Sequence, residues 1–266
     1  MKKAVFILGV VAAGIVVASC GSQKHDSSSS MASPASQQAA PNSPAPVATQ
    51  APSAGASSSF TDLANYDGAQ RIEDLAALGV FDSNSGAFRP NDPITRADFV
   101  RWLVKAHNAI IKDPASRIRL AQGTTATFAD VPPGNADFPY IQGLTNAGYV
   151  IGVDPTHFAP AKHLTREQMI FVKAAVDEGH TIVTAGHGAS ELQFSDKGRI
   201  GQKYLGAVYE DSTAGTTENF QRVYGRSSLF HPQAAVTRGE AAVALSVMKG
   251  EWPVSAASVF GRTPYP

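Results

Sequence analysis

The sequence has few of the residues from which enzyme and metal sites are built. Cys20 is the single cysteine among 266 residues, so an internal disulfide is excluded. Lys and Arg total 22 and Asp and Glu total 22, which leaves no basic excess for general nucleic-acid binding. His180 and His187 have no further ligand near them, and no Gly-rich phosphate loop, nucleophile elbow or zinc motif is present. We therefore expect no catalytic residue, cofactor, metal ion or nucleic-acid partner.

The longest apolar run, residues 4–18, lies at the N-terminus behind Lys2 and Lys3. It has the length of a secretory hydrophobic region and is shorter than the ~20 residues of a membrane-spanning helix. The run ends in VASCG, which resembles the bacterial lipobox, whose cysteine is lipidated. We predict a lipoprotein signal peptide at 1–19 and a lipid anchor on Cys20 that holds the protein on the periplasmic or extracellular side of a membrane. The alternative is an ordinary signal peptide with an incidental cysteine.

Residues 20–59 are rich in Ser, Ala, Pro, Gln and Gly, with Lys24 and Asp26 as their only full charges. Such a composition buries too little apolar surface to offset chain entropy, so we predict a disordered linker. A flexible chain of about 39 residues spans roughly 35 Å on average, which places a domain away from a membrane. A linker without a spacing role is the alternative.

From Phe60 onward three short motifs recur in the same order. Phe-x-Asp stands at 60–62, 128–130 and 194–196, Phe-x-Pro at 88–90, 158–160 and 230–232, and Thr-Arg at 95–96, 165–166 and 237–238. Such repetition indicates stacked copies of one supersecondary unit, each too small to bury its own apolar face. We place a first unit at 60–123, a second at 124–189, a third at 190–252 and a C-terminal tail at 253–266.

Each unit is predicted to be helix, loop, helix, which makes the fold class mainly α. In the first unit Ile72 and Leu75 recur at helical spacing before Gly79, a typical helix stop. The second unit shows the same pattern before Gly148, and the third shows a weaker one with a short additional helix expected within 217–224. The second helix of every unit is predicted to begin at the Thr-Arg motif, and Trp102 fits the apolar stripe of the first of these helices.

Each Thr-Arg motif opens a capping box, in which the threonine accepts from the N3 backbone N–H and the N3 side chain reaches back. The three pairs are Thr95 with Asp98, Thr165 with Gln168, and Thr237 with Glu240. A cap of this kind contributes about 1 kcal/mol, so helix capping explains these six residues.

The arginine after each threonine lacks such an explanation. It stands at N1, where the helix dipole disfavours a cation by roughly 0.3–1 kcal/mol. Free N–H groups at a helix start and an adjacent guanidinium together make a good anion site. We therefore predict that Arg96, Arg166 and Arg238 bind a ligand. The alternative is that each arginine pairs with a carboxylate of a neighbouring unit. The carboxylates considered are Asp62, Asp130 and Asp196.

With these motifs in triplicate, residues 60–250 resemble the surface-layer homology (SLH) domain. The resemblance implies three tandem helix-loop-helix repeats in a pseudo-threefold assembly with binding grooves between them. It also implies binding of secondary cell-wall polysaccharide linked to peptidoglycan, often pyruvylated, with the Thr-Arg arginines contacting the anionic sugar. The segments FPYIQGL (138–144) and RVYG (222–225) are especially similar to cyanobacterial-type members, whose Gram-negative envelopes imply an anchor in the outer membrane.

The sequence departs from the family pattern in its aromatic residues. It lacks a tryptophan early in the first helix and has only partial echoes of Gly-Tyr-x-Asp-Gly before Phe-x-Pro. The third unit diverges most, and its groove is the one expected to be inactive. Arg117 and Arg119, between the first two units, add charge near a groove, but their spacing assigns them no role.

We predict a non-enzymatic cell-envelope anchor that joins a lipid-bearing membrane to a wall polymer, with no catalytic domain after the repeats. The alternative is a protein–protein interaction module of the envelope in which the arginines are structural.

Overall fold

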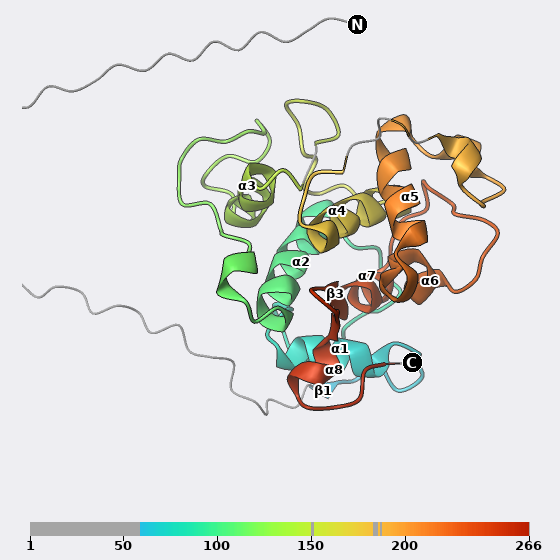
Figure 1. The fold of residues 1–266 in the computed structure, drawn as a ribbon. Coiled ribbons are helices and arrows are strands. Elements are labelled where there is room, and N and C mark those ends of the chain that lie inside the picture. Colours follow the sequence, from blue (N-terminus) through green and yellow to red (C-terminus); the bar gives the residue numbers. More distant parts are fainter. Residues whose placement is uncertain (1–58, 150–151, 183–185, 187, 266) are drawn as a thin grey trace, which may run out of the picture. The chain divides into compact units, whose positions relative to one another are not determined.

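The computed structural model describes residues 59–149, 152–182, 186 and 188–265, which all belong to the unit Thr49–Pro266 (Figure 1). The predicted signal peptide, the lipidation of Cys20 and nearly all of the predicted linker lie outside the described residues. Among the described residues, no helix combines the length and the apolar character needed to cross a membrane.

Helices provide most of the regular structure, in agreement with a mainly α fold class. The α-helices are α1 (Ala69–Ala77), α2 (Arg96–Ile110), α3 (Phe138–Asn146), α4 (Arg166–Glu178), α5 (Leu205–Thr213), α6 (Asn219–Tyr224), α7 (Arg238–Leu245) and α8 (Ala256–Val259). Short 3₁₀ helices lie at Pro114–Ser116, Ala189–Glu191, Lys197–Arg199, Gln202–Tyr204 and Gly215–Thr217. Two small strand pairs complete the described part. Strand β1 (Ser59–Phe60) runs parallel to β2 (Ser85–Gly86), and β3 (Val247–Lys249) runs antiparallel to β4 (Pro253–Ser255).

The helix boundaries follow the local signals in the sequence. Helices α2, α4 and α7 each begin at the arginine of a Thr-Arg motif, after a threonine in extended conformation. Helices α1 and α3 end shortly before Gly79 and Gly148, whose φ angles of 72° and 78° are left-handed and free of strain only in glycine. Helices α5 and α6 correspond to the weaker helical pattern and the additional short helix expected in the third unit.

Three backbone hydrogen bonds form a closed ring among the three units. The N–H of Ile94 donates to the carbonyl of Val236 at 2.9 Å, that of Val236 to Leu164 at 2.9 Å, and that of Leu164 to Ile94 at 3.0 Å. All three side chains are buried. Because these residues directly precede the Thr-Arg motifs, the ring fixes the starts of α2, α4 and α7 relative to one another.

Helix packing follows the same cyclic order. Helix α2 packs against α3, α4 against α5, and α7 against α1, so the second helix of each unit contacts the first helix of the next. Figure 1 shows α2, α4 and α7 toward the middle of this part of the chain, with α1, α3 and α5 around them. Each unit therefore buries its apolar face on its neighbours.

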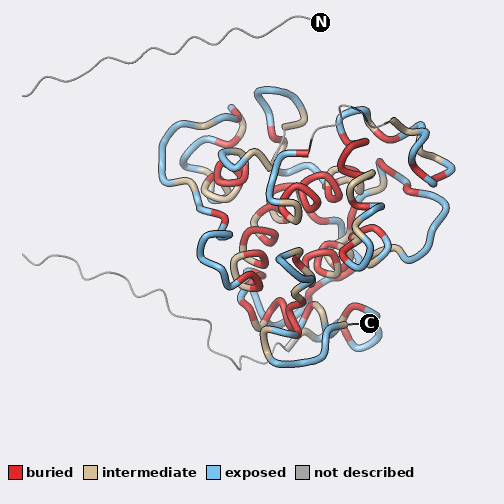
Figure 2. The backbone as a smooth tube through the Cα atoms, in the orientation of Figure 1, coloured by how far each residue is buried: buried red, intermediate tan, exposed pale blue. Residues whose placement is uncertain are grey.

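The core follows the inner helices and the Phe-x-Pro motifs. Phe88, Phe158 and Phe230 are fully buried, and the backbone of α2, α4 and α7 is where buried residues concentrate in Figure 2. Trp102 is 1 % exposed and lies 5.9 Å from Phe88 between ring centroids, which confirms its prediction as a core residue.

The segment treated as a C-terminal tail is part of the fold. Strand β4 pairs with β3, and α8 packs against α1 with Ala256 and Ala257 buried. Arg262 and the hydroxyl of Tyr265 both bind the carboxylate of Asp74 on α1, which is 1 % exposed. This segment thus covers the first helix of the first unit and joins the C-terminal residues to that unit.

Candidate ligand-binding site at the arginine junctions

All three predicted arginines lie where one unit meets the next. Each donates a hydrogen bond to the carbonyl of the Phe-x-Pro phenylalanine in another unit. Arg96 Nε donates to Phe158 at 2.8 Å, Arg166 Nη1 to Phe230 at 3.2 Å, and Arg238 Nε to Phe88 at 2.8 Å. The contacts run from the first unit to the second, from the second to the third and from the third to the first.

The expectation of free N–H groups beside these arginines is wrong. The N–H groups of the first two residues of α2, α4 and α7 are taken by carbonyls of the neighbouring Phe-x-Pro loop. Arg96 donates to Lys162 and Ala97 to Pro160, Arg166 to Ala234 and Glu167 to Pro232, and Arg238 to Asp92 and Gly239 to Pro90, at 2.8–3.2 Å. Hydrogen bonds between units occupy these backbone N–H groups, so of the two kinds of donor expected at the helix starts only the guanidinium groups can bind an anion.

The aspartates of the Phe-x-Asp motifs serve the Phe-x-Pro loop of their own unit. Each carboxylate accepts from two consecutive backbone N–H groups at 2.7–2.9 Å: Asp62 from Phe88 and Arg89, Asp130 from Phe158 and Ala159, and Asp196 from Phe230 and His231. The arginine of another unit binds the carbonyl of the same phenylalanine. The carboxylate therefore binds the N–H of the phenylalanine and the guanidinium binds its carbonyl, so the phenylalanine backbone lies between the two charged groups.

The residue after each of these phenylalanines has a left-handed backbone. Arg89, Ala159 and His231 have φ angles of 58°, 59° and 53°. A side chain in this conformation costs roughly 1–2 kcal/mol, so the two hydrogen bonds to each aspartate hold the loop in a shape that it would otherwise leave. Although burial acts in the opposite direction, hydrogen bonds from backbone N–H groups lower the pKa of Asp62 and of Asp196 below 3.8.

Arg96 is the most enclosed of the three arginines. It is 4 % exposed, and its guanidinium lies 4.4 Å from the ring centroid of Phe158. Burial lowers the pKa of Arg96 below its ordinary value, because water stabilises the charged form better than the core does. Arg96 is therefore placed to join the first unit to the second.

Arg166 is intermediate between an enclosed and an open side chain. Its side chain is 17 % exposed, its guanidinium lies 3.7 Å from the ring centroid of Tyr224, and Nη2 is 3.8 Å from Glu240 Oε1. Burial raises the pKa of the Tyr224 hydroxyl, which keeps that group neutral beside the arginine. The guanidinium is thus partly neutralised by Glu240.

Arg238 differs from the other two arginines in the contacts of its guanidinium. It is half-buried, and its guanidinium lies over Trp102 at 4.7 Å and over Phe88 at 4.9 Å from the ring centroids. Within the described part of the chain, neither Nη group donates a hydrogen bond or forms an ion pair. The Tyr66 side chain of the first unit lies directly against residue 239, which only glycine allows: a Cβ there would lie 2.1 Å from the tyrosine hydroxyl oxygen. The junction between the third and first units therefore holds a free guanidinium edge beside an aromatic side chain.

The capping residues lie at the starts of the same helices. Asp98 donates its backbone N–H to Thr95 Oγ1 at 3.1 Å, and Thr165 donates its backbone N–H to Gln168 Oε1 at 3.2 Å. Thr237 and Glu240 make both bonds of a capping box, at 3.2 and 2.8 Å. These contacts orient the helix starts that carry the three arginines.

Sequence reasoning missed Arg101, which joins three acidic groups. It contacts Asp82 at 2.8 Å, Asp98 at 2.5 Å and Asp137, the residue that precedes α3. Although burial lowers it, hydrogen bonds to Asp137 and Asp82 raise the pKa of Arg101 above its ordinary value. The spacing of Asp98 and Arg101 on one helix was visible in the sequence, but the pairing with Asp137 depends on how α2 packs on α3. Among the described residues, no group of three His, Cys, Asp or Glu side chains gathers as a metal site.

Residues 59–100 and 127–170 match the family model of the S-layer homology domain. These two segments of the chain are similar to the S-layer homology domain. They include the Phe-x-Asp, Phe-x-Pro and Thr-Arg motifs of the first and second units, and with them Arg96 and Arg166. S-layer homology domains are non-catalytic modules that bind cell-wall polymers, which associates their proteins with the cell envelope. No curated protein matches the chain.

Proposed function

We propose that this protein is a non-enzymatic anchor of the cell envelope. Three repeats in a pseudo-threefold assembly bind an anionic wall polysaccharide, pyruvylated or otherwise acidic, or a peptidoglycan-linked polymer. A lipid on Cys20 ties the same chain to a membrane, the outer membrane in a Gram-negative cell, and residues 20–59 span the distance. The two S-layer homology segments support the wall-binding part of this proposal.

The ring of hydrogen bonds supports counting the third unit with the other two. Val236 occupies the same place in the ring as Ile94 and Leu164, and α7 packs on α1 as α2 packs on α3. The third unit also repeats the aspartate contact, the left-handed residue and the arginine contact to a phenylalanine carbonyl. A divergent sequence thus keeps the same set of backbone contacts.

Arg238 carries the proposal for the ligand. Its Nη groups are without protein partners among the described residues, and a guanidinium edge of this kind matches a carboxylate with two parallel hydrogen bonds. The stacking on Trp102 and Phe88 fixes the plane of the guanidinium before any ligand arrives, which reduces the entropy lost on binding. We assign the leading ligand contact to Arg238, a weaker one to Arg166 because of Glu240, and the weakest to the enclosed Arg96. This proposal replaces the expectation from the sequence that the groove of the third unit is inactive.

Binding to isolated cell-wall sacculi tests this function. The full chain should sediment with native sacculi, and hydrofluoric acid stripping of the attached polymers should abolish sedimentation if the attached polymer is the ligand. Binding that survives stripping would move the ligand to the peptidoglycan itself. Failure to bind sacculi of either kind would contradict the anchor function.

A protein–protein interaction module is the second candidate, and the enclosure of Arg96 favours it. An arginine that is 4 % exposed and bonded to a carbonyl of another unit serves the fold before it serves a ligand. If Arg166 and Arg238 act in the same way, the surface between units would bind another envelope protein. Capture of a protein partner together with no sacculus binding would favour this reading.

A further inference from the structure

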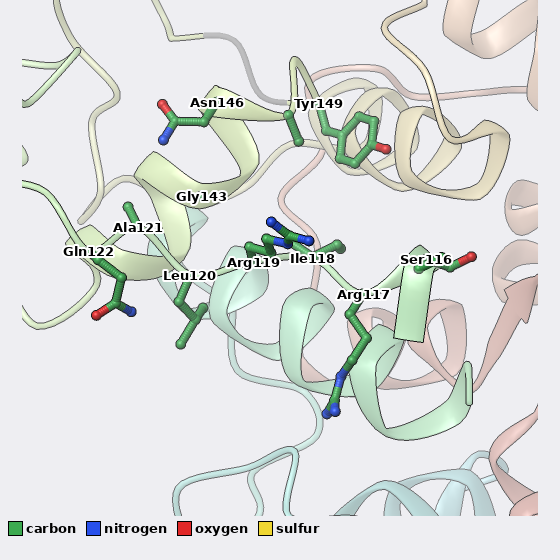
Figure 3. A pocket seen from close by; sticks show the side chains of 12 residues that line it. Ser116, Arg117, Ile118, Arg119, Leu120, Ala121, Gln122, Gly143, Asn146 and Tyr149 are labelled. Atoms are coloured by element: carbon green, nitrogen blue, oxygen red, sulfur yellow. The ribbon is translucent and has the colours of Figure 1, made fainter. Parts of the chain in front are cut away.

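A cavity separate from the arginine junctions lies between the segment 115–122 and the C-terminal half of α3 (Figure 3). Its volume is about 480 Å³, within the range of small-molecule sites. The polar side chains at its walls are those of Ser116, Arg117, Arg119, Gln122, Asn146 and Tyr149. The Phe-x-Asp, Phe-x-Pro and Thr-Arg motifs contribute no residue to it, although its α3 side lies within the matched segment 127–170.

The cavity is positively charged. Two arginines and no acidic residue line it, and both arginines are exposed. Neither Arg117 nor Arg119 makes an ion pair or side-chain hydrogen bond with a described residue. In Figure 3 the side chain of Arg119 points to the side on which Tyr149 lies, whereas that of Arg117 points the opposite way. Arg119 is therefore the cation available to a molecule in the cavity.

The wall that carries Arg119 is held in place before any ligand binds. The Asn108 side chain binds both the N–H and the carbonyl of Ile118 at 2.9 Å, and His107 Nε2 lies 2.8 Å from the carbonyl of Ser116. Farther along the segment, Ala121 donates its N–H to the carbonyl of Pro139 on α3 at 2.9 Å. Contacts to both α2 and α3 thus fix the backbone on either side of Arg119.

Gly143 lets this segment lie directly on α3. A Cβ at position 143 would lie 2.6 Å from the carbonyl oxygen of Arg119 and 3.4 Å from the N–H nitrogen of Ala121. Backbone atoms do not yield as a flexible side chain does, so only glycine allows this approach. Nearby, the Gln142 amide donates to Asn146 Oδ1 at 2.7 Å, which leaves the Asn146 NH₂ group as a donor.

We propose that this cavity binds a saccharide that carries a carboxylate. Arg119 pairs with the carboxylate, the amides of Asn146 and Gln122 bind hydroxyl groups, and the ring of Tyr149 packs against the sugar ring. A guanidinium, two amides and an aromatic ring without an opposing acid fit an acidic sugar better than a neutral one. The site shares no residue with the arginine junctions and stands apart from the proposed wall anchor.

Saturation-transfer NMR on the full chain in detergent tests the site, with glucuronic acid as the probe. Glucuronic acid should bind, and Arg119→Ala should raise its dissociation constant about tenfold or more, because a charge-assisted pair is lost. Arg119→Lys should recover part of the affinity. Arg117→Ala is the matched control and should change little, and all variants should keep the melting temperature because both side chains are exposed.

Neutral and sugar-free probes define the ligand class. Glucose and glucuronamide should bind more weakly than glucuronic acid, and acetate at equal concentration should not displace it. No binding of glucuronic acid, equal binding to the Arg119→Ala variant, or full displacement by acetate would each overturn the proposal. Because Arg238 is also proposed to bind a carboxylate, the titration is repeated in the Arg238→Ala chain. Glucuronic acid binding that remains sensitive to Arg119→Ala in that chain belongs to the cavity, whatever the result with sacculi, so failure of the wall anchor and failure of this site are told apart.

Discussion

The backbone of the Phe-x-Pro phenylalanine connects the two kinds of charged residue in the repeats. Its N–H goes to an aspartate of the same unit and its carbonyl to an arginine of another unit, three times over. The aspartate stabilises a strained loop, and the arginine fastens that loop to the next helix start. We propose that an arginine in such a place serves both the fold and a ligand, and that a more exposed one serves the ligand more.

Arg96 and Arg238 should differ in their effect on stability. Arg96→Ala leaves the carbonyl of Phe158 without its donor in a buried site, and such a loss costs about 1.5–3 kcal/mol. Arg238→Ala removes a half-buried side chain that water replaces more readily, so its cost should be smaller. Urea unfolding of both variants measures the difference. Equal costs, or a larger cost at Arg238, would contradict the distinction drawn between the two sites.

The aspartate contacts predict a loss of stability in acid. The pKa values of Asp62 and Asp196 are lower in the folded chain than the ordinary 3.8 of an unfolded one. Their contribution is therefore complete above about pH 4 to 5 and is lost as the pH falls through the lowered values. Asp62→Asn and Asp196→Asn should each weaken the dependence of the free energy of unfolding on pH below 4. The control is Asp67→Asn, an exposed residue outside the loops, and an equal change in it would count against this cause.

The elements of the fold cover one another in a cycle. The segment after α2 lies on α3, and the segment after α7, with β4 and α8, lies on α1. Asp74 on α1 aligns with Gly143 on α3 when the glycines that follow the two helices are matched. At this shared position, the backbone of the inter-unit segment packs on α3. On α1, the side chain at this position binds Arg262 and Tyr265 of the C-terminal segment. The C-terminal segment thus does for the first unit what an inter-unit segment does for the second.

Truncation after Gly250 should therefore destabilise the whole unit. It removes β4 and α8, uncovers the face of α1 on which α8 packs, and takes Arg262 and Tyr265 away from the carboxylate of Asp74. Thermal unfolding measures the loss. A truncated chain that melts like the full chain would show that the segment is only a tail.

On the scale of the whole molecule, cyclic packing makes the units interdependent. The ring through Ile94, Leu164 and Val236 closes only when all three units are present, and each outer helix needs the inner helix of the preceding unit. The position of the three arginines follows from this closure, because each reaches a carbonyl about 62 to 150 residues away in the chain.

The sequence predicted what local chemistry determines. Thr-Arg marked the starts of α2, α4 and α7, and Gly79 and Gly148 marked where α1 and α3 stop. It did not predict the occupied N–H groups at those helix starts or the contacts of Arg101, because their partners come from other units. The fold of the C-terminal segment was not predicted for a different reason. Strands of three residues and a helix of four show too little periodicity to be recognised in a sequence.

The affinity of Arg238 variants for native sacculi tests the central claim most directly. Arg238→Ala should weaken binding about 10- to 100-fold, because one or two charge-assisted hydrogen bonds to an anionic sugar are lost. Arg238→Lys should recover only part, since it keeps the charge and loses the bidentate geometry. Arg199→Ala, at an exposed position in the same unit, is the control and should bind as the unchanged chain does. Unchanged affinity of folded Arg238→Ala protein would contradict the account and favour the protein–protein interaction module with structural arginines.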